Sequence, residues 1–571
     1  MTEFIHTQNS FANGEIAPEF YLTKNIHGLA KLENMDVLSG GGLTRRPGLA
    51  DIANLAGCAR IFSFDISEQE NYILVFTNFS IQIYSGGSLI HTLVSPWADT
   101  ALPKIQFAGR GDSVVFVHPD VCPYILTKTG SNSFSLDKFS FYDTTDLVPQ
   151  VPLMTYDDMR NISIAVTAGP YGVKSAMFTT SANYWSTSNI GTIVCFNNQK
   201  WKIIEYVSAT VVYATSTVEY TLPINPITDW TESAFDNRHG WPYAVTFHQD
   251  RLVFGGTRYT PGGIWMSRVG DHHNFDVGTG LDDEAIVTTL LSKERQQICS
   301  LISSDKLQVL TSCGEWAIAN QPVTPSSMDI IQHTSVGSAT TVSLPPQKIE
   351  GETVFISGTL KEIRKLSLDT LGERYNADDL CAFSKHLINQ PVDIAYNNVS
   401  KQLYIVNSDG TMAVLNQNTA LGISAWARYI TYGNFTSVAI SGGETFVIIE
   451  KSGTYKLAKF TNTALNDSGT YNIEFCVSGI PLNFSGHRPK HLRLRKINLR
   501  LFETKSAFIN DMRVELPNEI YAPSHPGFSG DISMNFLGSQ LDGSISPWTI
   551  HSSEPMPITV FSVTLYGQYE I

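Results

Sequence analysis

Residues 248–285, HQDRLVFGGTRYTPGGIWMSRVGDHHNFDVGTGLDDEA, contain two short apolar strands with turn residues at their ends. The first strand, residues 252–254, is followed by two glycines, and a Thr-Pro-Gly-Gly turn leads into the second, residues 264–266. Glycine and proline at these places are typical of a β-hairpin. The stretch therefore predicts an antiparallel unit of short strands, which the acidic run at residues 282–284 closes.

Similar groups of short strands and turns recur through most of the chain. Two examples are residues 392–417, VDIAYNNVSKQLYIVNSDGTMAVLNQ, and residues 435–460, FTSVAISGGETFVIIEKSGTYKLAKF. The groups begin about 40 to 55 residues apart, which is the spacing of propeller blades. Six or seven candidate blades can be counted, without a WD or kelch signature. The pattern predicts a β-propeller-like core.

Breaks in this rhythm divide the chain into five parts. Residues 1–50 are rich in Gly, Asn and other polar residues, which predicts an extended N-terminal arm. Residues 51–150 begin the propeller, and residues 151–234, with apolar strands of their own, predict an inserted small β domain. Residues 235–466 hold the remaining blades, and residues 467–571 predict a C-terminal β domain. The predicted fold class is mainly β.

One strand of the C-terminal part requires an irregularity. In RPKHLRLRKINLRL, residues 488–501, apolar and basic residues alternate, but the alternation changes phase between Leu494 and Ile497. Because side chains of a strand point alternately to its two faces, one extra residue is needed to keep the leucines on one face. The pattern predicts a β-bulge at Arg495 and Lys496.

Composition limits the classes of function. The 571 residues carry a formal net charge of -14, so we expect no general attraction to nucleic acid or anionic membrane. Seven scattered cysteines without a CxxC pair indicate reduced thiols, with one disulfide left open. The first residues lack the pattern of a signal peptide, and no long apolar run predicts a membrane-spanning helix.

A search for chemistry yields no catalytic, cofactor or metal site. His272 and His273 are adjacent, and adjacent strand residues point to opposite faces, so packing is favoured over a metal site. The acidic run at 282–284 fits a solvated face better than a glycosidase pair. Trp265 fits a core position better than a sugar platform, and no P-loop, HExxH or GxSxG motif occurs. We therefore expect a protein that is not an enzyme.

Several stretches resemble one known family. They include SFANGEIAPEF, GLAKLENM and GGLTRRPG near the start, FHQDRLVFGGTR in the centre, and PGFSGD with SEPMPITVFSVTLYGQYEI at the end. Together they resemble the tail nozzle protein, or tail tubular protein B, of short-tailed bacteriophages (podoviruses). The resemblance implies a structural virion protein of the viral tail: a homohexameric ring that extends the DNA ejection channel and gates genome release.

The resemblance also implies partners and a location. These are other copies of the chain, an adaptor or tail tube protein, tail fibre or tail tip proteins, and genomic DNA that passes without sequence-specific binding. The location is the virion tail, after assembly in the host bacterial cytoplasm. The alternative is a propeller-type tail protein that binds or depolymerises host-envelope glycans, which the fold alone does not separate from the nozzle.

Two sets of residues are candidates for function. For Arg45 and Arg46, a solvated basic pair and a contact with another subunit or the adaptor are both open. The basic stretch 487–500 fits a subunit contact or a solvated face better than nucleic-acid binding, because aromatic residues are not interleaved with it.

The polar stretches 321–338 and 371–379 are candidate gate loops, with ordinary surface loops as the alternative. The candidate assembly contacts are Phe11, Glu15, Pro18, Arg45, Arg46, Arg493, Arg495 and Lys496, and the candidate gate loop contains Pro322, Pro325, Ser326 and Ser327.

Overall fold

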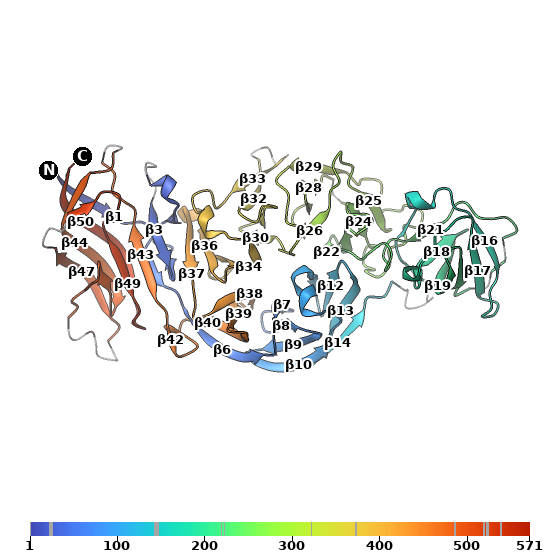
Figure 1. Ribbon diagram of the computed structural model, residues 1–571, viewed down its shortest axis with the longest axis horizontal. Coiled ribbons are helices and arrows are strands. Elements are labelled where there is room, and N and C mark those ends of the chain that lie inside the picture. Colours follow the sequence, from blue (N-terminus) through green and yellow to red (C-terminus); the bar gives the residue numbers. More distant parts are fainter. Residues whose placement is uncertain are drawn as a thin grey trace. The chain divides into compact units, whose positions relative to one another are not determined.

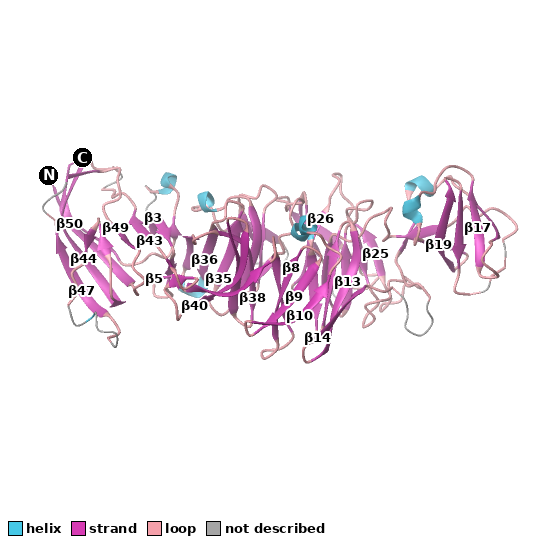
Figure 2. Ribbon diagram, turned by 60° about the horizontal axis from the view of Figure 1, so that its bottom comes forward, coloured by secondary structure: helices cyan, strands magenta, loops and turns pink. Residues whose placement is uncertain are grey.

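The chain is built almost entirely of short β-strands, as the sequence predicts (Figure 2). The computed structural model describes residues 2–21, 27–141, 148–218, 220–221, 223–320, 322–369, 371, 374–484, 487–517, 520, 525–536 and 540–570. Within these residues the helices are single 3-10 turns or little more: η1 (Pro18–Phe20), η2 (Asp99–Lys104), η3 (Asp157–Met159), η4 (Thr187–Asn189), η5 (Lys385–Leu387) and η6 (Thr419–Leu421).

The chain forms two compact units. One comprises residues 1–92, 347–367 and 377–571, and the other comprises residues 93–346 and 368–376. Among the described residues, seven groups of four strands form the blades of a β-propeller-like core (Figure 1). Six of the groups are sequential in the chain, and the seventh combines three sequential strands with a distant one. The count agrees with the six or seven blades expected from the repeat.

Three complete blades lie in the second unit. The first strands of neighbouring blades contact each other, β11 with β22 and β22 with β26, so these strands form the inner side of this part of the propeller. Their strands are β11 (Gln106–Arg110), β12 (Ser113–His118), β13 (Val121–Gly130), β14 (Ser133–Lys138); β22 (Ala244–His248), β23 (Arg251–Gly255), β24 (Gly263–Met266), β25 (Ile286–Thr289); β26 (Ile298–Ser303), β27 (Leu307–Thr311), β28 (Gly314–Ile318) and β29 (Ile330–Thr334).

The other four blades are β7 to β10, β30 to β33, β34 to β37, and a last blade of mixed origin. In the last blade β38, β39 and β40 are joined by β6, which pairs antiparallel with β40 although about 400 residues separate them. The strands are β7 (Arg60–Asp65), β8 (Asn71–Thr77), β9 (Ser80–Ser85), β10 (Ser88–Val94); β30 (Gln347–Ile349), β31 (Glu352–Ile356), β32 (Ile363–Leu368), β33 (Tyr375–Asp379); β34 (Pro391–Asn397), β35 (Gln402–Asn407), β36 (Met412–Asn418), β37 (Ile423–Tyr429); β38 (Asn434–Ser441), β39 (Glu444–Lys451), β40 (Thr454–Thr461) and β6 (Gly48–Leu55).

A seven-stranded sheet interrupts the blades of the second unit within the range predicted for the inserted domain. It has a core of its own that includes the fully buried Phe178 and Trp201. Ile193 instead joins the core beneath the blade that begins with β22, so the inserted sheet is packed against that blade. The strands are β15 (Leu153–Met154), β16 (Ile164–Ala168), β17 (Ser175–Thr180), β18 (Ile193–Phe196), β19 (Gln199–Ser208), β20 (Val211–Thr215) and β21 (Thr231–Ser233).

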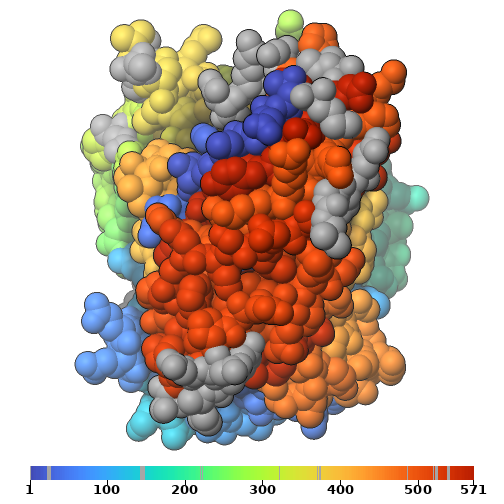
Figure 3. Space-filling model, turned by 90° about the vertical axis from the view of Figure 1, so that its left-hand side faces the viewer, coloured from blue at the N-terminus to red at the C-terminus, as the bar shows by residue number. Residues whose placement is uncertain are grey.

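Most C-terminal strands belong to two sheets, one of which also contains the blade β34 to β37, and they share one large hydrophobic core with the N-terminal strands. β41 and β42 instead join the sheet of the last blade. Figure 3 shows the blue N-terminal segment lying against red C-terminal strands, where β1 pairs antiparallel with β50. The remaining strands of this region are β1 (Thr2–Gln8), β2 (Gly14–Glu15), β3 (Gly28–Glu33), β4 (Met35–Val37), β5 (Leu43–Arg45), β41 (Asn466–Asp467), β42 (Tyr471–Asn472), β43 (Phe475–Gly479), β44 (His491–Thr504), β45 (Phe508–Ile509), β46 (Met512–Arg513), β47 (Phe528–Asn535), β48 (Gln540–Asp542), β49 (Thr549–Ser552) and β50 (Thr559–Glu570).

The prediction of an extended arm at residues 1–50 is wrong. Strands β1 to β6 are integral parts of three sheets, and Phe11, Leu29 and Met35 are fully buried in the common core. The prediction failed because several of these strands have only two or three residues, too few for a visible period. Gly14 shows how tight the region is: its φ is +61°, and a Cβ there would lie 2.3 Å from the Trp426 carbonyl oxygen.

The predicted β-bulge is confirmed. Along β44 the register with β50 shifts between Leu494 and Lys496, which leaves Arg495 as the additional residue. Because of this shift Leu494 and Ile497 both face the core, where each is at most 1% exposed.

Candidate functional site: a polar pocket among three blades

The basic pair near the N-terminus is buried and not available as an assembly contact. Arg46 is 0% exposed and forms a bidentate ion pair with Asp467, at 2.7 and 3.1 Å. It also donates to the Asn34 side chain at 2.8 Å and to the Ile430 carbonyl at 2.9 Å. Arg45 is also buried and donates to the carbonyls of the C-terminal region. Both interpretations of the pair from the sequence are therefore wrong, because partners more than 400 residues away cannot be recognised in one sequence.

Of the other three N-terminal candidates, two are buried and one is exposed. Phe11 is fully buried, and Glu15 is buried and accepts a hydrogen bond from the Leu32 amide at 2.8 Å. Arg428 lies 3.2 Å from the same carboxylate. Phe11 and Glu15 therefore stabilise the chain's own core, and the assignment of these two as assembly contacts is wrong, whereas Pro18 is exposed.

The basic residues of β44 lie on the accessible face of its sheet. Arg493 and Arg495 are exposed and Lys496 is half-buried. Arg495 pairs with Glu3 of β1 at 3.2 Å, and Lys496 lies over the ring of Tyr566. Their assignment as assembly contacts remains a prediction.

Only part of each candidate gate stretch is a loop. β29 (Ile330–Thr334) lies within 321–338, and β33 (Tyr375–Asp379) lies within 371–379, so these two parts are corrected to strand. In the remaining loop Pro322 and Ser326 are exposed and Pro325 is half-buried, while the Ser327 hydroxyl donates to the Pro322 carbonyl at 2.9 Å. This bond makes the loop a compact turn. Residues 321, 372 and 373 lie outside the described residues.

The acidic run at 282–284 supports its own loop. The Glu284 carboxylate accepts amide hydrogen bonds from the three residues Thr279, Gly280 and Leu281. The buried Arg251 donates to the carbonyls of Asp282 and Glu284. Asp282 is exposed and Asp283 and Glu284 are half-buried, so the run lies at the surface, where the Glu284 carboxylate organises a turn.

The histidine pair is also used structurally. His273 stacks on Phe139 with ring centroids 4.8 Å apart, and His272 lies 3.5 Å from Asp250. Across the part of the chain that the structure describes, no group of three or more His, Cys, Asp or Glu side chains is placed to hold a metal ion. Nor do the described residues contain a helix long and apolar enough to cross a membrane.

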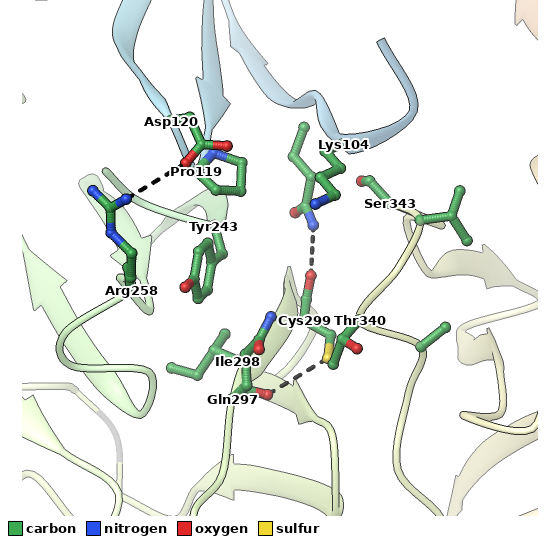
Figure 4. Close-up of a pocket in the computed structure, with 13 residues that line it drawn as sticks. Lys104, Pro119, Asp120, Tyr243, Arg258, Gln297, Ile298, Cys299, Thr340 and Ser343 are labelled. Atoms are coloured by element: carbon green, nitrogen blue, oxygen red, sulfur yellow. Dashed lines mark hydrogen bonds and ion pairs between the residues drawn. The ribbon is translucent and has the colours of Figure 1, made fainter. Parts of the chain in front are cut away.

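A pocket of about 260 Å³ lies among the three blades of the second unit (Figure 4). One wall comes from the blade of β11, with Lys104 at the end of η2 and Asp120 in the turn after β12. Tyr243, before β22, and Arg258, in the loop after β23, form the facing wall. The floor is the start of β26, and a segment at residues 339–343 completes the pocket.

The floor of this pocket is held rigidly. The Gln106 side chain donates to the Cys299 carbonyl at 2.5 Å, and the Cys299 Sγ lies 3.5 Å from the Gln297 carbonyl, as Figure 4 shows. Burial raises the pKa of the Cys299 thiol to about 12, so it is protonated at neutral pH and is a poor nucleophile or metal ligand. The pocket is therefore suited to binding, since its one sulfur is unreactive.

Side chains around the pocket leave several polar groups for a ligand. Among the described residues, Lys104 makes no ion pair, and Arg258 lies 4.0 Å from Asp120 in an exposed pair. Burial raises the pKa of Tyr243, which keeps its hydroxyl neutral. The sequence gives no signal of this pocket, because its residues come from six separate segments that each have the sequence of an ordinary turn or strand.

A second concentration of ionisable groups joins the inserted sheet to the propeller. Glu232 of β21 is fully buried, accepts a hydrogen bond from the Tyr184 hydroxyl at 3.0 Å, and lies 3.6 Å from the His239 Nε2. His239 is fully buried as well and contacts Asp236 through Nδ1 at 3.0 Å. Burial, with the nearby charge of Asp236, raises the pKa of Glu232 to about 8. This cluster is enclosed, so its role is structural, and the Glu232 carboxyl can stay protonated there.

Comparison with known proteins gives no family. No family model matches the chain, and no curated protein matches it. Among solved structures, the C-terminal WD40 domain of Sif2 is 12% identical with a TM-score of 0.34, over 73% of this chain and 99% of that one. The β-propeller domain of Cps50 (Swd1) from Myceliophteria thermophila is 8% identical with a TM-score of 0.37, over 72% and 100%. Because these scores are low, the fold assignment rests on the strand pairing within this chain.

Proposed function

We propose that the chain is a structural subunit of a phage tail nozzle, six copies of which form a ring that extends the DNA ejection channel. The observation that carries this proposal is the resemblance of three distant stretches, residues 10–20, 247–258 and 526–571, to that one family. Several strands and turns separate these stretches, so the resemblance is not confined to one segment of the chain.

The roles of the charged residues in these stretches support a structural protein. Glu15 and Arg251 are buried and bond to backbone groups of their own chain. Buried charges that bond to backbone groups of their own chain in this way fix how strands meet and leave no reactive group in an open cleft. A channel subunit must keep its shape while the genome passes, and buried contacts of this kind help to fix that shape.

The charge balance supports free passage of DNA. A subunit with a net charge of -14 repels phosphate, and DNA that must slide is best served by a wall that does not bind it. In this proposal the ring contacts an adaptor or tail tube protein and tail fibre or tip proteins, gates genome release, and reaches the virion tail after assembly in the bacterial cytoplasm.

The test is the state of the purified protein and its place in particles. Light scattering with electron microscopy should find rings of six copies of the 63.0 kDa chain, alone or with the adaptor protein. Antibody labelling should place the chain on virion tails. A protein that stays monomeric with and without the adaptor, and is absent from purified virions, would refute the proposal.

A further inference from the structure

The pocket of Figure 4 has the size and the polar groups of a ligand site. We propose that it binds a single sugar acid, that is, a hydroxylated sugar ring with one carboxylate. This inference concerns the chemistry of the pocket alone and holds whether or not the chain belongs to a phage tail.

The volume limits the ligand to one ring. Pockets for drug-sized molecules measure roughly 300–1,000 Å³, and this pocket of about 260 Å³ lies just below that range. The sides provide apolar surface from Val342 and Ala339, which are half-buried. Such surfaces fit the C–H face of a sugar ring, while a bare inorganic ion would leave them uncovered and in water.

The charges select a single negative group. Lys104 and Arg258 are the cations of the lining, and Asp120 is its one carboxylate, so the lining has an excess of one positive charge. Asp120 lies beside Arg258 at 4.0 Å, whereas Lys104 has no such partner among the described residues. We therefore assign the ligand carboxylate to Lys104, where a charge-assisted hydrogen bond can form.

Three neutral groups are available for hydroxyls. They are the Tyr243 hydroxyl, the Gln297 amide and the Thr340 hydroxyl, which lie on different walls of the pocket. An amide and hydroxyls both donate and accept, which matches sugar hydroxyls that do the same. A divalent cation would find one carboxylate only, and a nucleotide would exceed the available volume and charge.

The experiment measures binding of D-glucuronate to the full chain by calorimetry and ligand-observed NMR. D-glucose provides the ring without the charge, and acetate and inorganic phosphate provide the charge without the ring. We expect glucuronate to bind with a Kd on the order of 0.1–1 mM, and each of the other compounds at least about ten-fold more weakly. Added salt should weaken the glucuronate complex because the site is open to solvent.

Three variants localise the binding. Lys104→Met and Thr340→Val alter exposed side chains and should fold, and the first should weaken glucuronate binding roughly ten-fold. Lys361→Met, in the exposed turn between β31 and β32, is the matched control and should bind like the wild type. No binding of glucuronate, equal binding of glucose or of acetate, or an equal loss in the Lys361 variant would each overturn the proposal.

Discussion

Replacing Arg46 by Met should destabilise the contact between the N-terminal strands and β41, which carries Asp467. The side chains of Arg46 and Asp467 are 0% and 3% exposed, and Met keeps the bulk of the arginine stem without its charge. The Asp467 carboxylate would remain buried. Its Oδ2 atom would keep one side-chain donor, the Thr431 hydroxyl at 2.8 Å. Removing one partner of a buried ion pair costs about 3–5 kcal/mol, because the other charge is left without compensation.

Hydrogen exchange followed by mass spectrometry is the suitable assay, because it reports local opening in a chain with two compact units. A loss of 3–5 kcal/mol corresponds to protection that is lower by roughly a hundred- to several thousand-fold. We expect this loss in peptides that cover β3 to β5 and β41. Peptides of the inserted sheet, β15 to β21, should be unaffected.

Two further variants separate the charge from the packing. Arg500→Met removes an exposed arginine paired with Asp531 at 2.8 Å and should leave exchange unchanged, since exposed pairs contribute little. The double variant Arg46→Met with Asp467→Leu should recover part of the lost protection, because it removes the stranded carboxylate. If Arg46→Met exchanges no faster than the Arg500 variant, the buried pair does not stabilise this junction.

The remaining predictions concern other joints of the chain. Gly14→Ala should destabilise the contact of β2 with β37, because the added Cβ would lie 2.3 Å from the Trp426 carbonyl oxygen. Gly40→Ala is the control, because its Cβ enters open space. Equal melting temperatures of the two variants would contradict this prediction. Glu232→Gln should remove a pH dependence of stability. The folded pKa of Glu232 is about 8 and its ordinary value is 4.5, so between these values the folded state keeps a proton that the unfolded state has lost, and wild-type stability falls as pH rises. Proteolysis of the inserted sheet should therefore be faster near pH 8 than near pH 5 in the wild type, with a smaller difference in the variant. Deleting residues 1–55 should cause aggregation, since β40 loses its partner; a soluble monomer with native circular dichroism would show that the last blade does not need β6.

Much of the fold could be predicted because it depends on local patterns. Blades repeat short strands and turns at regular spacing, and the change of phase between Leu494 and Ile497 indicates a bulge directly. The N-terminal region could not be predicted, because a strand such as β2 has two residues and no period. Its stability comes from partners such as Asp467, which lies 421 positions from Arg46.

The candidate sites were predicted less well for a related reason. Arg45 and Arg46 form a basic pair in the sequence, and only the fold shows that both side chains are covered. Lys104, Tyr243 and Cys299 meet in one pocket although each belongs to a different blade. A single sequence contains no signal for such convergence, whereas the basic residues of β44 were correctly assigned to one strand.

The pairing of β6 with β40 also sets an order of events during synthesis. β6 leaves the ribosome early, but its partner follows about 400 residues later, which takes about 20 to 80 s at roughly 5–20 residues per second. Throughout this time the edge of β6 is unpaired, and unpaired edges recruit other strands. We therefore expect the nascent chain to depend on a chaperone that covers residues 48–55, and the yield of native protein to rise when translation of residues 56–453 is completed quickly.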